Sequence, residues 1–147
     1  MLQKYIVLLL ISLLLGGCAI GRKQDYTLAT PTLAYTGKGI LAAGVHDQRP
    51  YILDHDKDED FVGIQRGGYG NPFDVTTESK KPLAEDMTQV LINALSHSGA
   101  RINPLKLPPS LSRVKVIEEF KASNADKLLL LSLYEWKTDT MMGSELI

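Results

Sequence analysis

The sequence predicts one small domain of the α/β (α+β) class, with a mixed sheet of four to five strands and two helices packed on it. Two observations predict this class. The chain has 147 residues, which is enough for one domain and too few for two. Short apolar runs of strand length alternate with helical segments, and strands separated by helices favour an α/β sandwich.

The first two strands are predicted on either side of an acidic loop. Residues 39–46 form a short apolar run, which the polar residues 47–50 end. Residues 54–60 are polar and acidic, and residues 61–66 can form a second strand. Glycine, asparagine and proline then break the chain between residues 67 and 72.

Two helices follow. Apolar side chains recur at helical spacing over residues 82–98 and form one stripe: Leu83, Met87, Val90, Leu91, Ala94 and Leu95. Pro82 suits the first turn, and Gly99 suits a C-terminal cap. Ser112 is predicted to cap a second helix, which ends near residue 123 and buries Val114, Ile117 and Phe120.

The last part of the chain contains the most apolar strand. Residues 101–103 can form a brief strand, and the run at residues 127–136 predicts a central strand covered on both faces. Residues 137–143 read as a turn, and residues 145–147 can begin another strand. Two interpretations of this end stay open: a stub of a strand, or a domain at residues 39–147 that lacks a C-terminal part.

The amino terminus reads as an export signal over residues 1–17. Lys4 supplies a positive charge, and an apolar run of about ten residues follows, which is half the length that a spanning helix needs. Leu15, Gly16, Gly17 and Cys18 come next. Small residues before Cys18 leave room for a peptidase at the preceding bond.

Leu15, Gly16, Gly17 and Cys18 resemble the lipobox of bacterial lipoproteins. That resemblance implies a diacylglycerol on the Cys18 sulfur, cleavage before Cys18 and acylation of the new amine, so that several acyl chains anchor the protein in a membrane. Residues 18–38 would be the acylated cysteine and a tether, part of which can pair as an edge strand. The alternative is an ordinary cleaved signal with a buried free cysteine.

Ala19 bears on which membrane is used. In enterobacterial lipoproteins an aspartate after the cysteine commonly retains the protein in the inner membrane, and the residue here is alanine. The resemblance therefore implies the outer membrane, with the domain facing the periplasm.

Composition excludes several classes of protein. Sixteen basic and 17 acidic residues give a net charge of −1, which disfavours a nucleic-acid partner. A single cysteine excludes an intrachain disulfide framework and a cysteine-rich zinc module. No cofactor is predicted.

The acidic loop at residues 54–60 resembles a cation site in one respect. Carboxylates stand at every second position, as oxygen ligands do in calcium loops: Asp54, Asp56, Asp58 and Asp60. Glu59 stands where the sharp turn of such a loop needs glycine, and Gln65 where a bidentate glutamate is needed. We therefore predict no metal site, and these four aspartates are the nearest candidates.

The glycine-rich segment at residues 63–70 lacks the lysine and hydroxyl residue that complete a phosphate-binding loop. It predicts a loop or bulge in which Arg66 and Tyr69 are candidate contacts for a partner or a glycan. At the end of the first strand, Asp47 and Arg49 can pair and fix the turn. His46 is the nearest candidate for a general base, with no nucleophile of recognisable signature beside it.

The order of lipobox, strand ending in Asp47 and Arg49, amphipathic helix and late apolar strand resembles small lipoproteins of the YajG type. That resemblance implies an outer-membrane accessory protein that is not an enzyme. We expect a membrane-anchored periplasmic lipoprotein that serves as an accessory or assembly subunit of a cell-envelope complex. The alternatives are a module that binds a glycan, lipid or cation through residues 54–72, and, third, a hydrolase.

Overall fold

A computed structural model describes residues 22–29 and 31–141 of the chain. Its first sheet has three strands in the order β5-β2-β6, and β2 (Ile40–Asp47) pairs in parallel with both β5 (Arg101–Pro104) and β6 (Lys127–Leu133). The start of β2 is also tied to the loop before β6, since Ile40 N donates to Asp126 Oδ2 at 2.7 Å. The single α/β domain that the sequence predicts is confirmed.

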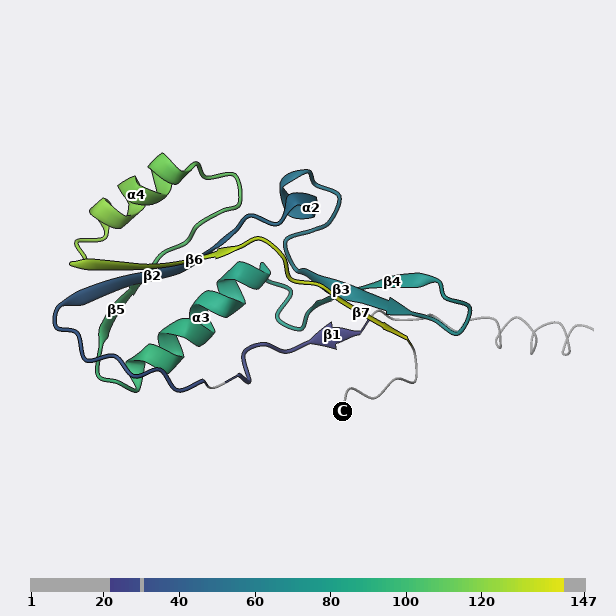
Figure 1. Cartoon of the computed structure of the whole chain (residues 1–147), viewed down its shortest axis with the longest axis horizontal. Helices are drawn as coiled ribbons and strands as arrows, with labels where there is room; N and C mark the ends of the chain where they lie inside the picture. The colour runs from purple at the N-terminus through teal and green to yellow at the C-terminus, as the bar shows by residue number, and fades with distance from the viewer. Residues whose placement is uncertain (1–21, 30, 142–147) are drawn as a thin grey trace, which may run out of the picture.

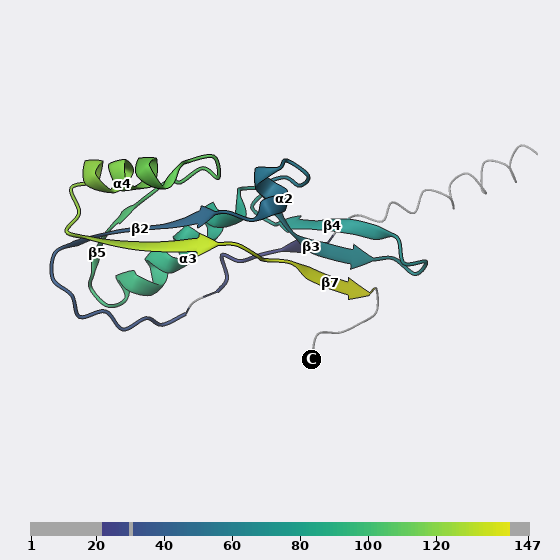
Figure 2. The same ribbon diagram turned by 45° about the horizontal axis from the view of Figure 1, so that its top comes forward.

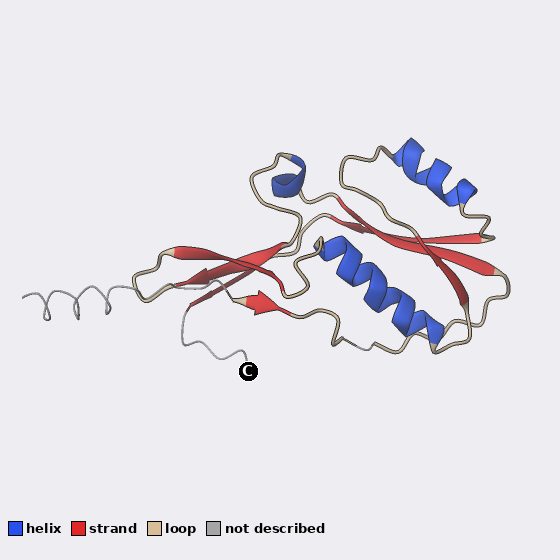
Figure 3. Cartoon of the chain, turned by 180° about the vertical axis from the view of Figure 1, so that it is seen from behind, coloured by secondary structure: helices blue, strands red, loops and turns tan. Residues whose placement is uncertain are grey.

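The second sheet has four strands in the order β1-β4-β3-β7. β3 (Phe61–Arg66) and β4 (Pro72–Thr77) form an antiparallel hairpin, which β1 (Lys23–Gln24) and β7 (Thr138–Met141) flank in parallel. The far half of this sheet projects beyond the helices (Figures 1 and 3). The strands are thus divided between two sheets instead of forming one.

Two helices cover opposite faces of the three-stranded sheet: α3 (Leu83–Ser96) and α4 (Arg113–Ala122) (Figure 1). Alternate residues of β2 point to the two sides, as in any strand. Leu41 and Ala43 pack with α3, whereas Ala42 packs with Val116 of α4. A third helix, α2 (Pro50–Leu53), is a single turn after β2 that the sequence did not predict.

The central strand is β2, and the prediction that residues 127–136 are central and covered on both faces is wrong. β6 lies at the edge of its sheet, and Leu131 is 47% exposed. The side chains of β2 are small at Ala42, Ala43 and Gly44, so neighbouring segments can pack closely on both of its sides. A Cβ at Gly44 would lie 3.0 Å from Leu105 Cβ, so the chain that leads to α4 approaches β2 more closely than a larger residue would allow.

Other predictions can be compared element by element. Ser112 caps α4, as predicted, and accepts a hydrogen bond from Lys115 N. The helix buries Val116 and partly buries Phe120, whereas Val114 and Ile117 are exposed, so the predicted buried face was wrong for these two. The face of α4 toward the sheet is set by the four-residue step from Val116 to Phe120.

Two strands were missed. β4 was not predicted because its residues mix Pro72, Asp74 and threonines, and β7 lies where a turn was expected. Both gain their strand character by pairing with β3. Within the predicted tether, β1 pairs with β4 as an edge strand. The predicted signal, lipobox and last strand lie outside the described residues.

Candidate functional site

The two sheets meet at a buried ion pair. Arg49 and Asp47 have side chains that are 0% and 1% exposed, and three hydrogen bonds join them: from Nε to Oδ1 at 2.9 Å and to Oδ2 at 3.1 Å, and from Nη2 to Oδ2 at 2.7 Å. Arg49 N also donates to Asp47 Oδ1. The pairing that the sequence suggested is confirmed, and it fixes the turn that leads from β2 into α2.

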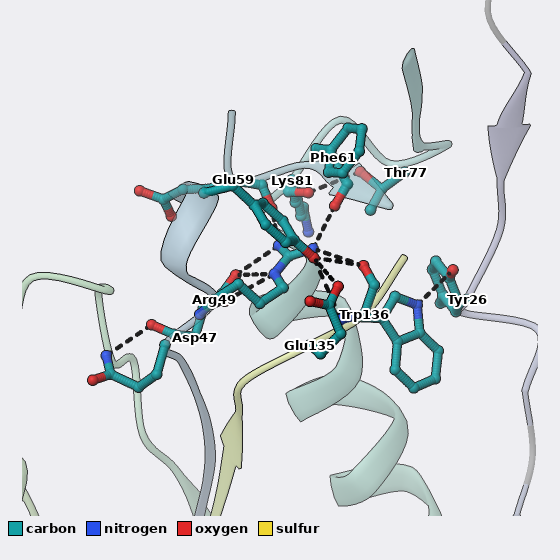
Figure 4. Close-up of polar contacts among 11 residues, drawn as sticks. Tyr26, Asp47, Arg49, Glu59, Phe61, Thr77, Lys81, Glu135 and Trp136 are labelled. Atoms are coloured by element: carbon teal, nitrogen blue, oxygen red, sulfur yellow. Dashed lines mark hydrogen bonds and ion pairs between the residues drawn. The ribbon is translucent and has the colours of Figure 1, made fainter. Parts of the chain in front are cut away.

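Arg49 also links three other segments through their carbonyl groups (Figure 4). Nη1 donates to Phe61 O at 2.6 Å and to Trp136 O at 3.4 Å, and Nη2 donates to Glu59 O at 3.3 Å. These carbonyls belong to the start of β3, to the connection between β6 and β7 and to the loop before β3. One guanidinium therefore holds the three-stranded sheet to the four-stranded sheet.

Aromatic side chains extend this junction. The Tyr51 hydroxyl lies 2.9 Å from Glu135 Oε1 and 3.0 Å from Trp136 O, both acceptors for its proton. Trp136 Nε1 donates to Tyr26 Oη at 2.9 Å, and the two rings meet edge to face. The connection between β6 and β7 is thus fixed to α2 on one side and to the segment after β1 on the other.

The electrostatics of the junction are those of a structural site. Burial alone would lower the pKa of the Arg49 guanidinium, but the hydrogen bond and charge of Asp47 outweigh it, and the pKa is raised. Burial and the hydrogen bond to Glu135 raise the pKa of Tyr51. Both groups therefore keep their protons at neutral pH. Among the described residues, every buried side-chain nitrogen or oxygen has a hydrogen-bond partner.

His46, the candidate base, is buried at the end of β2. Its Nε2 lies 3.1 Å from Gln48 Nε2, which also donates to the carbonyls of Asp47 and Pro109. His55 lies in the acidic loop with a positive φ of 60°, and His97 contacts Asn93 O at the end of α3. The structure does not bring the three histidines together.

The aspartates of the acidic loop do not form a group of metal ligands. Lys57 forms its ion pair with Asp74 of β4, at 2.6 Å, and not with a neighbour in the loop. Burial, and then the charge of Asp58, raise the pKa of Asp60. In the described part of the chain, no three histidine, cysteine or acidic residues are grouped as metal ligands would be. Asp54 and Asp56 are exposed.

The candidate partner contacts, Arg66 and Tyr69, lie at the far end of the β3–β4 hairpin but differ in role. Arg66 donates two hydrogen bonds to Asp139 of β7, from Nε at 2.8 Å and from Nη2 at 2.7 Å, so it braces the hairpin against β7. Tyr69 is 99% exposed in the loop that joins the two strands. Of the two, Tyr69 is the more exposed side chain.

An apolar groove of about 420 Å³ lies between α3, β6 and the segment after β1. Met87 and Leu91 of α3 line one wall, and Leu131 and Leu133 of β6 line the other. Leu33 and Pro31 close the groove on the side of the tether. The sequence analysis did not predict this surface because it expected the leucine run at residues 127–136 to be covered on both faces. The signal in the sequence was the length of this run, which two predicted helices are too few to cover.

No family model matches the chain, and the comparisons with curated proteins and with solved structures returned no match. Among residues 22–29 and 31–141, no helix is both long and apolar enough to cross a bilayer.

Proposed function

We propose that the protein is a lipid-anchored, non-enzymatic accessory subunit of a cell-envelope complex, held at the periplasmic face of the outer membrane. It contacts an envelope protein through the tip of the β3–β4 hairpin. The observation that carries the contact is Tyr69, whose side chain is 99% exposed on a hairpin that projects beyond the helices (Figure 1). The anchor rests on the sequence Leu15, Gly16, Gly17 and Cys18.

The hairpin is suited to present a side chain because ion pairs fix its strands to neighbouring segments. Lys57 pairs with Asp74 on β4, and Arg66 pairs with Asp139 on β7. Gly67 N donates to Asn71 O at 2.9 Å and Gly70 N donates to Gly67 O at 2.8 Å, so the loop itself has a defined turn. A tyrosine held this way loses little conformational freedom when a partner covers it.

The buried ion pair supports a non-enzymatic role. Asp47 and Arg49 form a buried ion pair, and their hydrogen bonds are directed at each other and at backbone groups. Their geometry serves to hold the two sheets together. The exposed Tyr69 side chain lies on the β3–β4 hairpin instead.

The contact is tested by crosslinking in cells. A photoreactive residue replaces Tyr69 in the full chain, and the adducts are identified by mass spectrometry. We expect one abundant envelope protein to be captured. The matched control places the same residue at Val114, which is exposed on α4 at the opposite end of the molecule. Equal capture of the same proteins from both positions, or none from Tyr69, would refute the hairpin contact.

The anchor is tested separately. The parent chain and a Cys18→Ala variant are grown with radiolabelled palmitate, and the membranes are fractionated. We expect label and outer-membrane recovery for the parent and neither for the variant. A parent chain that takes up no label would contradict the anchor while leaving the hairpin contact open to its own test.

A further inference from the structure

The outer edge of β6 is a second surface, on the other side of the molecule from the hairpin loop. β6 pairs with β2 on one side, and no described strand pairs with its other side. Figure 2 shows β6 and β7 following each other along the same side of the molecule, outside β2 and β3. An open edge of this kind presents backbone donors and acceptors to any strand that comes near.

This edge lacks the features by which proteins usually protect one. Natural edges carry charges, proline or bulges, whereas β6 has the sequence Lys-Leu-Leu-Leu-Leu-Ser-Leu, with one charge at its start. Leu131, Tyr134, Trp136 and Met141 are exposed along the same continuous segment. The apolar groove beside Leu131 adds to this surface. A continuous exposed apolar surface of this kind is typical of a site where proteins associate.

We propose that the β6 edge pairs antiparallel with the β6 edge of a second copy of this chain, which joins the two three-stranded sheets into one sheet of six. The proposal does not depend on the anchor or on the hairpin contact. Two properties of the edge favour a second copy as its partner: the direction of its backbone groups and the order of its charges.

The backbone groups limit the register. Leu133 O accepts a hydrogen bond from Gln48 N, so Leu133 points its backbone groups toward β2. Because this direction alternates along a strand, Leu128, Leu130 and Ser132 point theirs outward. Two copies related by a twofold axis at Leu131 then pair Leu130 with Ser132 of the second copy through these outward groups. The two Leu131 side chains meet at the closely spaced type of antiparallel position.

The charges favour this register over the one that follows it along the strand. With the axis at Leu131, Lys127 of each copy lies across from Glu135 of the other, two residues beyond the end of β6. An axis one residue later would set Lys127 against Lys137, and like charges across a pair of strands are destabilising. The register at Leu131 also joins the grooves of the two copies into one apolar surface.

The first test measures mass and contact. The full chain with Cys18→Ser, in mild detergent, is analysed by sedimentation equilibrium across a dilution series, and we expect a reversible dimer. Leu131→Cys in this background places two thiols across the axis and should form an intermolecular disulfide on mild oxidation. Leu129→Cys is the matched control, on the same strand and the same face but opposite Leu133 of the second copy, and it should not crosslink.

The second test reverses charges. Lys127→Glu or Glu135→Lys should each weaken the dimer about tenfold, and the double variant should restore it, because the two symmetric pairs are again of opposite charge. Tyr51→Phe removes the hydrogen bond to Glu135 and keeps its charge, so it should leave the dimer intact. Leu131→Lys, at a half-exposed site that a folded monomer tolerates, should give a monomer.

A monomeric parent chain would overturn the proposal, and so would disulfide formation that is as fast for Leu129→Cys as for Leu131→Cys. Charge reversals whose double variant stays as weak as the single ones would overturn the register. If Tyr69 captures an envelope protein while the parent chain is monomeric, the proposed function stands and this inference fails. If the chain is dimeric and Tyr69 captures nothing, the reverse holds.

Discussion

The chain contains two arginine–aspartate pairs with nearly the same geometry and different surroundings. Arg49 and Asp47 are 0% and 1% exposed, whereas Arg66 and Asp139 are 39% and 42% exposed, and each arginine donates through Nε and Nη2. The buried arginine also donates to three backbone carbonyls, at and just before the start of β3 and in the connection between β6 and β7. The exposed pair joins two neighbouring strands that are already hydrogen-bonded.

Burial changes what such a pair does for stability. Water screens an exposed pair and competes for its hydrogen bonds, so exposed pairs contribute about 0–1 kcal/mol. Removing one member of a buried pair leaves the other charged and without a partner. The same chemistry therefore makes a required junction at one place and a minor brace at the other.

The largest expected effect is that of Arg49→Met. The variant leaves Asp47 charged in the interior and removes the short hydrogen bond to Phe61 O, and we expect a loss of about 3–5 kcal/mol in the free energy of unfolding. Urea unfolding at neutral pH measures it. The matched control is the same substitution at Arg66. Similar losses in the two variants would remove the distinction between the pairs.

Gly63→Ala is next, because it acts where β7 meets β3. A Cβ at this position would overlap Thr138, including its backbone nitrogen at 2.9 Å, so β7 would be pushed away. We expect a loss of about 1–3 kcal/mol. Gly68→Ala is the control, since nothing lies within 4 Å of a Cβ there. An unchanged stability for Gly63→Ala would mean that β7 contributes little to the sheet.

Ser112→Ala removes the cap of α4 and should cost about 1 kcal/mol in thermal or urea unfolding. Ser112→Asp retains an acceptor at the cap and should keep most of the stability. If alanine and aspartate behave alike, the contact from Lys115 N, which is long at 3.4 Å, contributes nothing to the helix.

Arg66→Met should lower the free energy of unfolding only slightly, and by far less than Arg49→Met, because water screens the exposed pair. The effect should shrink further in high salt, because salt screens exposed charges. A loss comparable to that of Arg49→Met would show that the far end of the four-stranded sheet depends on this pair. Hydrogen exchange in β7 would then locate the opened region.

The smallest effects are those of pH on two carboxyl groups with opposite shifts. The hydrogen bond and charge of Arg66 lower the pKa of Asp139, so its contribution is present above the ordinary carboxyl pKa and is lost as the pH falls through the lowered value. Burial and Asp58 raise the pKa of Asp60, so its ionisation destabilises the fold as the pH rises.

The corresponding variants should differ in sign. Asp139→Asn should lower the melting temperature slightly at neutral pH, and Asp60→Asn should raise it, with both differences vanishing in acid. Melting curves across this pH range measure both. If both variants change the melting temperature in the same direction at neutral pH, the opposite pKa shifts of Asp139 and Asp60 are contradicted.

Local signals in the sequence located most elements. The apolar run at residues 39–46, the stripe from Leu83 to Leu95 and the cap at Ser112 correspond to β2, α3 and α4 within one or two residues. These signals are local because they depend on periodicity and capping. The partners of each strand are not local, which is why the leucine-rich β6 was placed at the centre and β2, with its small residues, was not.

The functional residues also show that local sequence signals do not reveal long-range partners. The short spacing of Asp47 and Arg49 suggested their pairing, but the carbonyls of Glu59, Phe61 and Trp136 carry no sequence signal and appear only once the chain is folded. Arg66 and Tyr69 were grouped because they are neighbours in sequence. In the folded chain both lie at the far end of the hairpin, but Arg66 bonds to Asp139, 73 residues away, whereas Tyr69 is exposed.

The parallel pairing of β2 has a consequence for the order in which the protein acquires structure. Ile40 at the start of β2 is bonded to Asp126, 86 residues later, and β6 follows only after that point. A chain synthesised from its amino end must therefore hold its central strand β2 unpaired on one side until β6 has emerged. Contacts of such long range slow folding, because the long loop between the two strands must close before they can pair.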